Sequence, residues 1–381
     1  MVLAGPVASG GRQDSPLLGL SRIFQKETKG IRLIMKALVK TAPGPGNLEI
    51  WDRSYPRLIN EHSVIIQVRA CGICGTDLHI WQDKFMSWPP VTIGHEFSGE
   101  IVEVGSACAN FKVGDFVVSE PQVNHCNGCQ FCRSGKGHLC PQKLTMGWRT
   151  DGAMQEYVSV QERYLHPMPN GLDFELASLC EPTAITVYNV VESDSIHYND
   201  FVVVQGSGPI GILSAYHAKK LGARKVLLTG IDQSEICRFD VAKMIGADIL
   251  LNVQKQNLRE AVMDFTDGQG ADCVVETSGA PSAIAESVGL LKKSGVLVGT
   301  GIPSADQLLF PWKDAVLKAL QLRLFMSSSY TSWDKALNCL QQDADILRHL
   351  ITWTGVIEDW EKIFNELVEE KQVKGVITFS H

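Results

Sequence analysis

The second part of the chain alternates strand-like and helical segments, and this alternation restricts the possible folds more than any other feature. From Phe201 onward, the apolar runs "DFVVVQG", "KVLLTG", "DILLNV" and "DCVVETSG" are short and rich in valine and leucine. Between the first two lies "PIGILSAYHAKKLGA", which has helical apolar spacing, and a second helix is expected near "CRFDVAKMIGA". Strands that alternate with helices predict a parallel, doubly wound α/β sheet.

The preceding part, from Met35 to about Val160, has a different pattern. Its strand-like runs, among them "SVIIQVRA", "FSGEIVEVG" and "GDFVVSE", are separated by glycine, proline, asparagine and aspartate. This pattern predicts a small barrel or an irregular sheet. After Met326, the helical "SWDKALNCLQQ" and the strand-like "KGVITFS" are too short for a third domain, so we expect them to complete the first one. The expected division is an N-terminal extension (1–34), a β-rich domain (35–185, completed by 328–381) and an α/β domain (186–327).

The N-terminal extension has five basic residues against Asp14 and Glu27, and it shows no clear period. We expect a disordered extension or the product of an upstream start codon, with Met35 as a natural start. A transit peptide is the alternative, since such peptides are rich in arginine and serine and poor in acids.

The composition favours small-molecule chemistry. The formal net charge of −7 argues against a broad nucleic-acid surface, and no apolar run approaches the ~18 residues that span a bilayer. Eleven cysteines in 381 residues are too sparse for a secreted disulfide scaffold. We therefore expect a cytoplasmic protein with reduced thiols, and no nucleic-acid or membrane partner.

Four cysteines are crowded into fifteen positions, with the spacing C-x2-C-x2-C-x7-C: Cys126, Cys129, Cys132 and Cys140. Thiolates at this spacing predict a tetrahedral zinc site, which is structural because four sulfurs leave no position for water or substrate. The alternatives are reduced cysteines in a loop and a nucleic-acid zinc ribbon. Local positive charge, from Arg133 and Lys136, is too sparse for the ribbon.

A second group of metal-binding side chains precedes this cluster. Cys74 lies in "ACGICGTDLHIW", and His95 and Glu96 follow in "TIGHEFSGEIVEVG". Sulfur, nitrogen and oxygen donors together suit a zinc ion with an open coordination position, which is the arrangement of a catalytic site. We therefore predict two zinc ions per chain, one structural and one catalytic.

A nucleotide site is predicted at "VVVQGSGPIGILSAYHAKKLG". Its G-x-G-x-x-G pattern directly follows a buried strand and opens a helix, which is the context that supports dinucleotide binding. Gly206 permits a tight turn, Gly208 lets the backbone approach a pyrophosphate, and Gly211 permits close packing of helix and strand. Pro209 and Ile210 complete the turn. The helix N-terminus offers free N–H groups to the phosphates.

Together, these features resemble the zinc-dependent medium-chain dehydrogenases from about Met35 to the C-terminus. The resemblance rests on five motifs: C-G-T-D-x-H (74–79), G-H-E (94–96), V-G-x5-F-x-V-G-D-x-V (104–117), the four-cysteine lobe and G-S-G-P-I-G (206–211). It implies a GroES-like catalytic domain and a Rossmann nucleotide-binding domain. It is strongest for the sorbitol (iditol) and threonine dehydrogenase branch.

The resemblance also implies a further zinc ligand, Glu181 in "CEPTA", which matches a glutamate typical of that branch. Glu96 and Glu181 could alternate on the metal or hold its water, and the sequence leaves open which is the direct ligand. Cys180 keeps open the alternative of a second cysteine ligand, as in the alcohol dehydrogenases.

The cofactor is expected to be NAD or NADP. Gly230 falls where relatives of the threonine branch have the acid that binds the ribose, while Asp232 and Arg238 lie nearby. Without a carboxylate at Gly230 to repel a 2′-phosphate, we expect NADP to be accepted at least comparably to NAD.

The implied reaction is hydride transfer between a secondary alcohol and the nicotinamide, with zinc as a Lewis acid. Thr76 would hydrogen-bond the substrate oxygen, and His79 would pass the proton to solvent. A polyol is the preferred substrate and L-threonine the alternative, with Arg149 as the partner of its carboxylate. A non-catalytic nucleotide-binding relative is the alternative of another class. We also expect a homo-oligomer, either a dimer or a tetramer.

Overall fold

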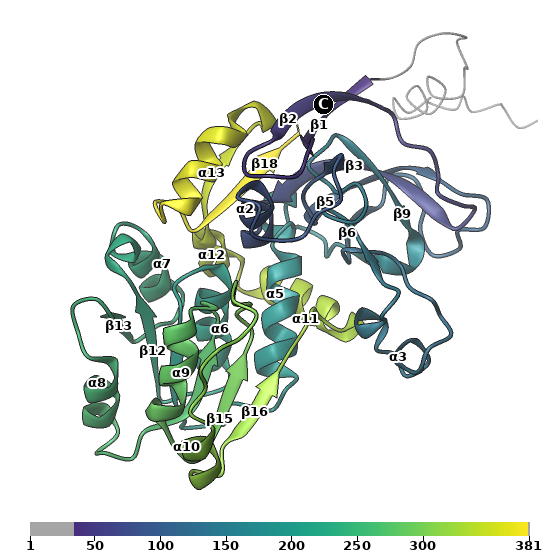
Figure 1. Cartoon of the computed structure of the whole chain (residues 1–381). Coiled ribbons are helices and arrows are strands. Elements are labelled where there is room, and N and C mark those ends of the chain that lie inside the picture. The colour runs from purple at the N-terminus through teal and green to yellow at the C-terminus, as the bar shows by residue number, and fades with distance from the viewer. Residues whose placement is uncertain (1–33, 380–381) are drawn as a thin grey trace, which may run out of the picture.

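Helix α5 (Cys180–Thr186), continued by the π-helical turn η3 (Val187–Val191), runs through the middle of the molecule. It lies between a β-rich half and an α/β half (Figure 1). The computed structural model describes residues 34–379, so the expectation for the N-terminal extension lies almost entirely outside the described residues. Within the described part, no helix is long and apolar enough to cross a membrane.

The α/β half is built on a parallel sheet of six strands in the order β13-β12-β11-β14-β15-β16. β11 lies near its centre, and all five of its residues, four of them apolar, are buried. The strands are β11 (Phe201–Gln205), β12 (Lys225–Gly230), β13 (Ile249–Asn252), β14 (Ala271–Glu276), β15 (Leu291–Gly299) and β16 (Gln321–Leu324). The order reverses between β11 and β14, and such switch points are where ligands bind in open α/β sheets.

Helices cover this sheet on both faces, and a separate apolar core lies under each face. They are α6 (Pro209–Lys220), η4 (Asp232–Glu235), α7 (Arg238–Ile245), α8 (Leu258–Phe265), α9 (Pro281–Leu290) and α10 (Trp312–Leu317). The expected doubly wound α/β fold is therefore confirmed. The helices α8 and α9 were not among the predicted elements.

The β-rich half contains a seven-stranded sheet in the order β10-β6-β5-β3-β18-β17, with β9 also pairing with β3. Its strands are β3 (Ser63–Gly72), β5 (Glu96–Val104), β6 (Phe116–Ser119), β9 (Tyr157–Gln161), β10 (Leu165–Pro167), β17 (Ile351–Gly355) and β18 (Lys374–Thr378). The smaller sheets consist of β1 (Ile34–Lys40), β2 (Leu48–Ser54), β4 (Val91–Thr92), β7 (Gln122–Asn124) and β8 (Leu144–Thr145). The short helical elements are α2 (Gly75–Trp81), α3 (Gln130–Arg133), η1 (Gly137–Leu139), η2 (Glu162–Tyr164) and α4 (Phe174–Ala177).

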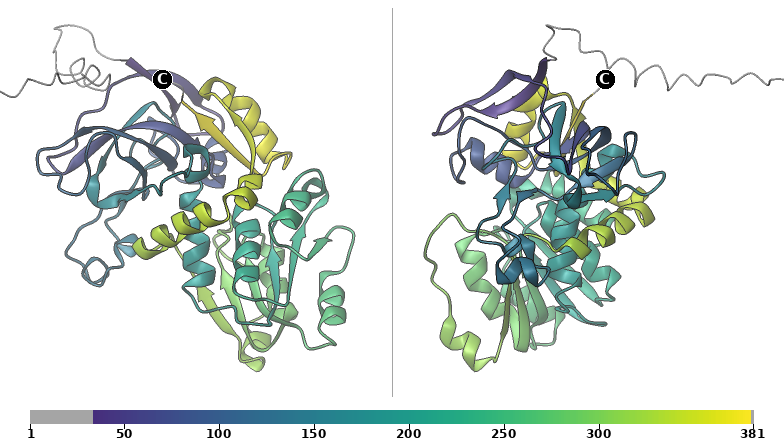
Figure 2. Two further views of the ribbon diagram at one scale, coloured as in Figure 1. Left: turned by 180° about the vertical axis from the view of Figure 1, so that it is seen from behind. Right: turned by 90° about the vertical axis from the view of Figure 1, so that its right-hand side faces the viewer.

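The C-terminal segment connects the two halves. α11 (Tyr330–Gln342) packs across α5, as the rear view in Figure 2 shows, and it is followed by α12 (Ala344–Leu347), η5 (Arg348–Leu350), η6 (Ile357–Asp359) and α13 (Trp360–Val368). β18 then pairs antiparallel with β3, opposite Ala70, Cys71 and Gly72. This pairing supports the proposed division, in which residues 328–381 complete the first domain.

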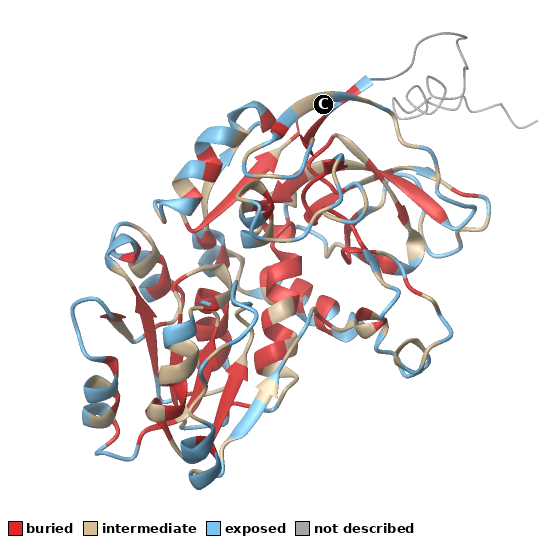
Figure 3. Cartoon of the chain, in the orientation of Figure 1, coloured by how far each residue is buried: buried red, intermediate tan, exposed pale blue. Residues whose placement is uncertain are grey.

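Burial explains the central position of α5. All of its residues except Ile185 are buried, because the helix contacts both halves (Figure 3). A helix that is buried on every side carries little sequence amphipathicity. Contacts on every side therefore fix the residues of its first turn in place.

Candidate active site

Cys74, His95 and Glu96 come together at the ends of two neighbouring strands. Their candidate ligand atoms all lie within 4.8 Å of one another. β3 and β5 are antiparallel neighbours in which Gly72 faces Glu96, so the segment that follows β3 lies beside the segment that precedes β5. Cys74 then caps the N-terminus of α2. His95 and Glu96 are buried, and Cys74 is partly exposed.

Asp77, which the sequence analysis did not single out, holds this geometry. Its fully buried carboxylate accepts hydrogen bonds from the backbone N–H groups of Cys74 (2.8 Å) and Gly94 (3.1 Å). It also lies 3.9 Å from Nδ1 of His95. One side chain thereby fixes the two loops that present the ligands.

Lys374 was also missed. It lies in β18, about 280 residues from Glu96 in sequence, yet its ammonium group donates to the carboxylate of Glu96 and to the carbonyl of Ile73 (2.8 Å). Both charged side chains are at most 2% exposed. Burial disfavours the charge of Lys374, but Glu96 and Cys74 outweigh this effect and raise its pKa. A lysine at the start of the apolar run "KGVITF" was the only signal in the sequence.

Glu181 and Cys180 are neighbours in the first turn of α5 that meet different surroundings. Burial raises the pKa of Glu181 to about 7, opposed by His95 and reinforced by Glu96, so its carboxyl group interacts with the ligand cluster. It does not belong to the closely spaced group of three within the described residues. The sulfur of Cys180 lies 3.7 Å from the carbonyl oxygen of Trp333, on the side packed against α11.

The donor set fits zinc. His95 has a buried Nδ1 with no hydrogen-bond partner within the described residues. Burial opposes its charge, but Cys74, Asp77 and Glu181 together raise its pKa to about 10. Thiol and carboxyl groups thus concentrate negative charge around one imidazole, and a divalent cation would balance that charge.

The four cysteines also lie together. The sulfur–sulfur distances are 3.5 Å (Cys129–Cys132), 3.6 Å (Cys126–Cys140) and 3.9 Å (Cys126–Cys132). All eleven cysteines, which fall within the described residues, are free thiols. Backbone N–H groups of Gly128 and Cys129 lower the pKa of Cys126 to about 6, which favours the thiolate that zinc requires. This cluster therefore fits a closed, all-sulfur zinc site.

The two clusters are linked through the lobe that carries the cysteines. His138 is buried, and its Nε2 lies 3.3 Å from the hydroxyl of Tyr188 in η3. Burial lowers the pKa of Lys143, while Glu181, Glu120 and Cys140 oppose this shift. One lysine thus lies within electrostatic reach of both a structural cysteine and the carboxyl group of Glu181.

The glycine-rich turn has the geometry of a phosphate cradle. Gly206 has φ +112°, and a Cβ there would lie 2.8 Å from Oγ1 of Thr277. A Cβ on Gly211 would lie 2.0 Å from the carbonyl oxygen of Gly206. Gly208, by contrast, faces open space and precedes Pro209 at the start of α6. The residues present therefore fit a dinucleotide, with the backbone at Gly208 open to a pyrophosphate.

The other predicted cofactor residues have protein partners. The carboxylate of Asp232 accepts a hydrogen bond from Asn252 (2.8 Å) and lies 3.4 Å from Lys255. Arg238 is bound by Glu370 (3.0 Å), which the sequence analysis did not consider, and by two backbone carbonyls. The guanidinium group of Arg238 is therefore already occupied.

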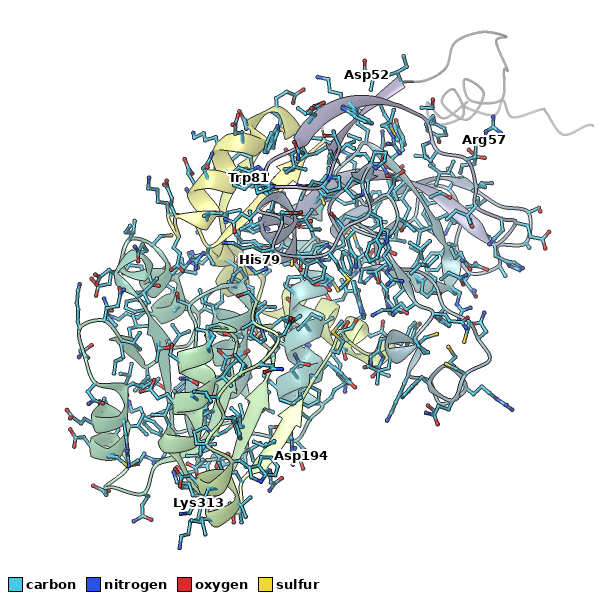
Figure 4. The ribbon with its side chains drawn as sticks, viewed as in Figure 1. Asp52, Arg57, His79, Trp81, Asp194 and Lys313 are labelled. Atoms are coloured by element: carbon cyan, nitrogen blue, oxygen red, sulfur yellow. The ribbon has the colours of Figure 1, made fainter. Side chains whose placement is uncertain are left out.

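The remaining predicted residues are distributed around the cluster of Cys74, His95 and Glu96 (the open cluster). Thr76 is partly buried in the first turn of α2. His79 is exposed on the same helix, on its side toward the α/β half (Figure 4). Trp148 packs edge-on against the ring of His95, with 5.1 Å between ring centroids. Arg149 lies 4.5 Å above the ring of Trp88, whose backbone N–H donates to the carbonyl of Trp148 (2.9 Å).

The segment "MSSSYTSW" (326–333) mixes aromatic and hydroxyl side chains that have partners within the protein. Three of its hydroxyl groups, from Ser329, Thr331 and Ser332, donate to Glu192. Its last residue, Trp333, is buried and stacks on His166 with 5.5 Å between ring centroids. These contacts account for three hydroxyl groups of the segment without a substrate.

Comparison with known proteins adds two family matches and several relatives. Residues 60–170 match the "Alcohol dehydrogenase GroES-like domain" and residues 209–342 match "Zinc-binding dehydrogenase". The chain is 35% identical to a sorbitol dehydrogenase of Halalkalibacterium halodurans over 90% of its own length and 99% of the relative. It is 33% identical to an L-threonine 3-dehydrogenase of Rhizobium etli, over 88% and 95% respectively. A putative zinc-binding dehydrogenase from Sinorhizobium meliloti, solved with NADP bound, superimposes with a TM-score of 0.81 at 25% identity, over 91% of this chain and 99% of that one.

Proposed function

Because this chain belongs to the zinc-dependent medium-chain dehydrogenase family, we propose that it oxidises a secondary alcohol, preferably a polyol, to the ketone with NAD or NADP. The observation that supports this most directly is the close grouping of Cys74, His95 and Glu96, whose three donors leave a coordination position open. Four closely spaced protein donors would have argued for a structural site instead.

Cys74, His95 and Glu96 would hold the catalytic zinc, with Glu181 beside them, and the four cysteines would hold the structural zinc. When bound, zinc supplies Lewis acidity that favours loss of the hydroxyl proton, and the nicotinamide supplies the hydride acceptor. Asp77 is a positioning residue, since it fixes the loops of Cys74 and His95.

Thr76 and His79 lie three residues apart on α2 and therefore on one face of the helix. We assign Thr76 to the hydrogen bond with the substrate hydroxyl and His79 to transfer of the proton to solvent. Although the side chain of His79 reaches solvent, the protein that surrounds the rest of it desolvates the imidazole and lowers its pKa, and Lys84 reinforces this shift. The imidazole is therefore neutral and able to accept that proton near neutral pH.

A polyol suits the surroundings of the cluster. Glu96 and Glu181 accept hydrogen bonds from hydroxyl groups next to the reacting one, and the rings of Trp148 and Trp88 pack against C–H groups. The similarity to a sorbitol dehydrogenase supports this class. L-threonine is the second candidate, supported by the relative from Rhizobium etli and by the exposed Arg149 as a partner for the carboxylate.

The test is a panel of sorbitol, xylitol, galactitol, inositols, L-threonine and simple alcohols, assayed with NAD and with NADP. We expect nicotinamide reduction with at least one polyol and its loss after zinc chelation. Activity on simple alcohols with none on any polyol would contradict the substrate class. Absence of nucleotide binding would favour a non-catalytic role.

Two further properties belong to this proposal. We propose a cytoplasmic location, in keeping with eleven free thiols. We also propose a homo-oligomer, because Leu309, which precedes α10, Leu317 in α10 and Leu324 in β16 have largely exposed apolar side chains. Light scattering measures the oligomeric state.

A further inference from the structure

The carboxyl end of β12 has no room for the acid that usually binds the adenosine ribose. A Cβ on Gly230, the last residue of β12, would lie 2.5 Å from the ring of Phe239 and 2.6 Å from Cβ of Ser234. Ser234 therefore occupies the space that an aspartate at this position would need. The recognition of the ribose must come from another part of the chain.

Ser234 is the centre of a short hydrogen-bonded chain that starts in the glycine-rich turn. The hydroxyl of Ser207, between Gly206 and Gly208, donates to Oγ of Ser234 (2.8 Å). The hydroxyl of Ser234 in turn donates to Oε2 of Glu370 (2.7 Å). Both serines are at most 4% exposed, so this chain has a fixed geometry.

Glu370 comes from the segment between α13 and β18, far from β12 in sequence. Its backbone has φ +57°, a conformation that costs a non-glycine residue free energy and persists where the surroundings enforce it. Arg238 holds the other carboxylate oxygen at 3.0 Å, and the side chain of Glu370 is 24% exposed. A partly accessible carboxylate is thus pinned beside the end of β12.

We propose that Glu370 supplies the carboxylate that binds the ribose hydroxyls of NAD and that it selects against NADP. An acid at the end of the second strand accepts hydrogen bonds from the 2′-hydroxyl and repels a 2′-phosphate. Asp232 is a weaker candidate because its side chain is 56% exposed, whereas Ser234 and Arg238 hold the carboxylate of Glu370 in one position. Arg238 does not favour a 2′-phosphate while it pairs with Glu370. This inference rests on the proposed function and opposes the expectation, drawn from Gly230 alone, that NADP is accepted equally well.

The test measures binding without any alcohol, by titrating the purified protein with NADH and with NADPH and following nicotinamide fluorescence. We expect the wild-type protein to bind NADH about thirtyfold more tightly than NADPH. Glu370→Gln should reduce this ratio by at least about tenfold, mostly through tighter NADPH binding, because it removes the negative charge and frees Arg238. Glu369→Gln is the matched control, since its exposed carboxylate pairs with Lys371, and it should leave the ratio within about twofold.

Glu370→Gly guards against a folding defect, because glycine adopts φ +57° without strain. It should reduce the ratio as Glu370→Gln does. An unchanged ratio in both variants, or equal affinities in the wild-type protein, would overturn the role of Glu370 and leave the dehydrogenase function intact. A wild-type protein that binds neither nucleotide would overturn the proposed function and this inference together.

Discussion

The two metal-binding clusters of this chain are built in opposite ways. The four cysteines come from fifteen consecutive positions in one loop, three of them are partly exposed, and backbone N–H groups contact their sulfurs. Cys74 and His95 lie in the loops that follow β3 and precede β5, and Glu96 opens β5. Their supports, Asp77 and Lys374, are buried ionic side chains from α2 and β18. A closed site can therefore form locally, whereas an open site requires the whole β-rich half to hold its incomplete ligand set in place.

The largest expected effect is loss of catalysis without loss of the fold. His95→Asn should lower kcat/KM by at least about a thousandfold, equivalent to ~4 kcal/mol, because it removes a ligand of the open cluster. Zinc content should fall from two ions to one per chain. Steady-state kinetics, elemental analysis and circular dichroism measure the three quantities. His197→Asn, at an exposed histidine, is the control. Retention of both ions and of turnover would show that the open cluster is not the catalytic site.

The second prediction concerns the distant support of the open cluster. Lys374→Met leaves the buried carboxylate of Glu96 without its partner, which should cost about 3–5 kcal/mol in the free energy of unfolding. Zinc affinity at this cluster should fall by about 10- to 100-fold, as for other groups that orient ligands. Chemical denaturation and competition with a chelator measure these effects.

A matched double variant separates the pairing of the two charges from the other polar contact of Lys374. Lys374→Met combined with Glu96→Gln removes both charges and keeps the aliphatic packing, so it should recover more than about 1 kcal/mol of the lost stability. No recovery would mean that the hydrogen bond from Lys374 to the carbonyl of Ile73 matters more than its pairing with Glu96.

The third prediction tests the cluster of four cysteines (the closed cluster). Cys129→Ser should lower the free energy of unfolding by about 2 kcal/mol, because structural zinc binding contributes directly to folding. It should also expose residues 126–140 to proteolysis, while kcat per folded molecule stays within about threefold at low temperature. Thermal unfolding, limited digestion and zinc analysis measure this. A loss of turnover as large as that of His95→Asn would erase the distinction between the two clusters.

The same contrast explains what could be predicted from the sequence. The strands around "VVVQGSGPIG" and the four cysteines were predictable because their partners lie within a few residues, and the structure confirms the fold. Lys374 and Glu370 were missed because their roles depend on where the C-terminal strand and helix return. A charged residue beside an apolar run gives no hint of which distant carboxylate or arginine it will meet.

The fourth prediction concerns proton transfer near the open cluster. His79→Asn should lower kcat by about tenfold, at the low end for a general acid–base group, because an exposed site lets solvent replace it in part. Zinc content should not change. The lowered pKa of His79 means that wild-type activity is lost only below its ordinary pKa of 6.5, as the imidazole becomes protonated. The variant should not show this loss of activity at low pH. Rescue of its activity by added imidazole would support the assignment. An unchanged pH profile would remove His79 from the proton path.

The smallest expected effect distinguishes two neighbouring residues of α5. If Cys180 were a ligand, as in the alcohol dehydrogenases, Cys180→Ser would weaken zinc binding strongly. Its sulfur instead contacts the carbonyl oxygen of Trp333, and serine retains a hydrogen-bond donor for that oxygen. We therefore expect zinc content and kcat/KM to stay within about twofold of wild type. Glu181→Gln, one residue further on, should lower kcat/KM by about tenfold or more, because it removes a carboxylate that interacts with His95 and Glu96. If Cys180→Ser instead causes the larger loss of zinc and of kcat/KM, Cys180 is a second sulfur ligand of the open cluster. The resemblance to the polyol branch at "CEPTA" would then be misleading.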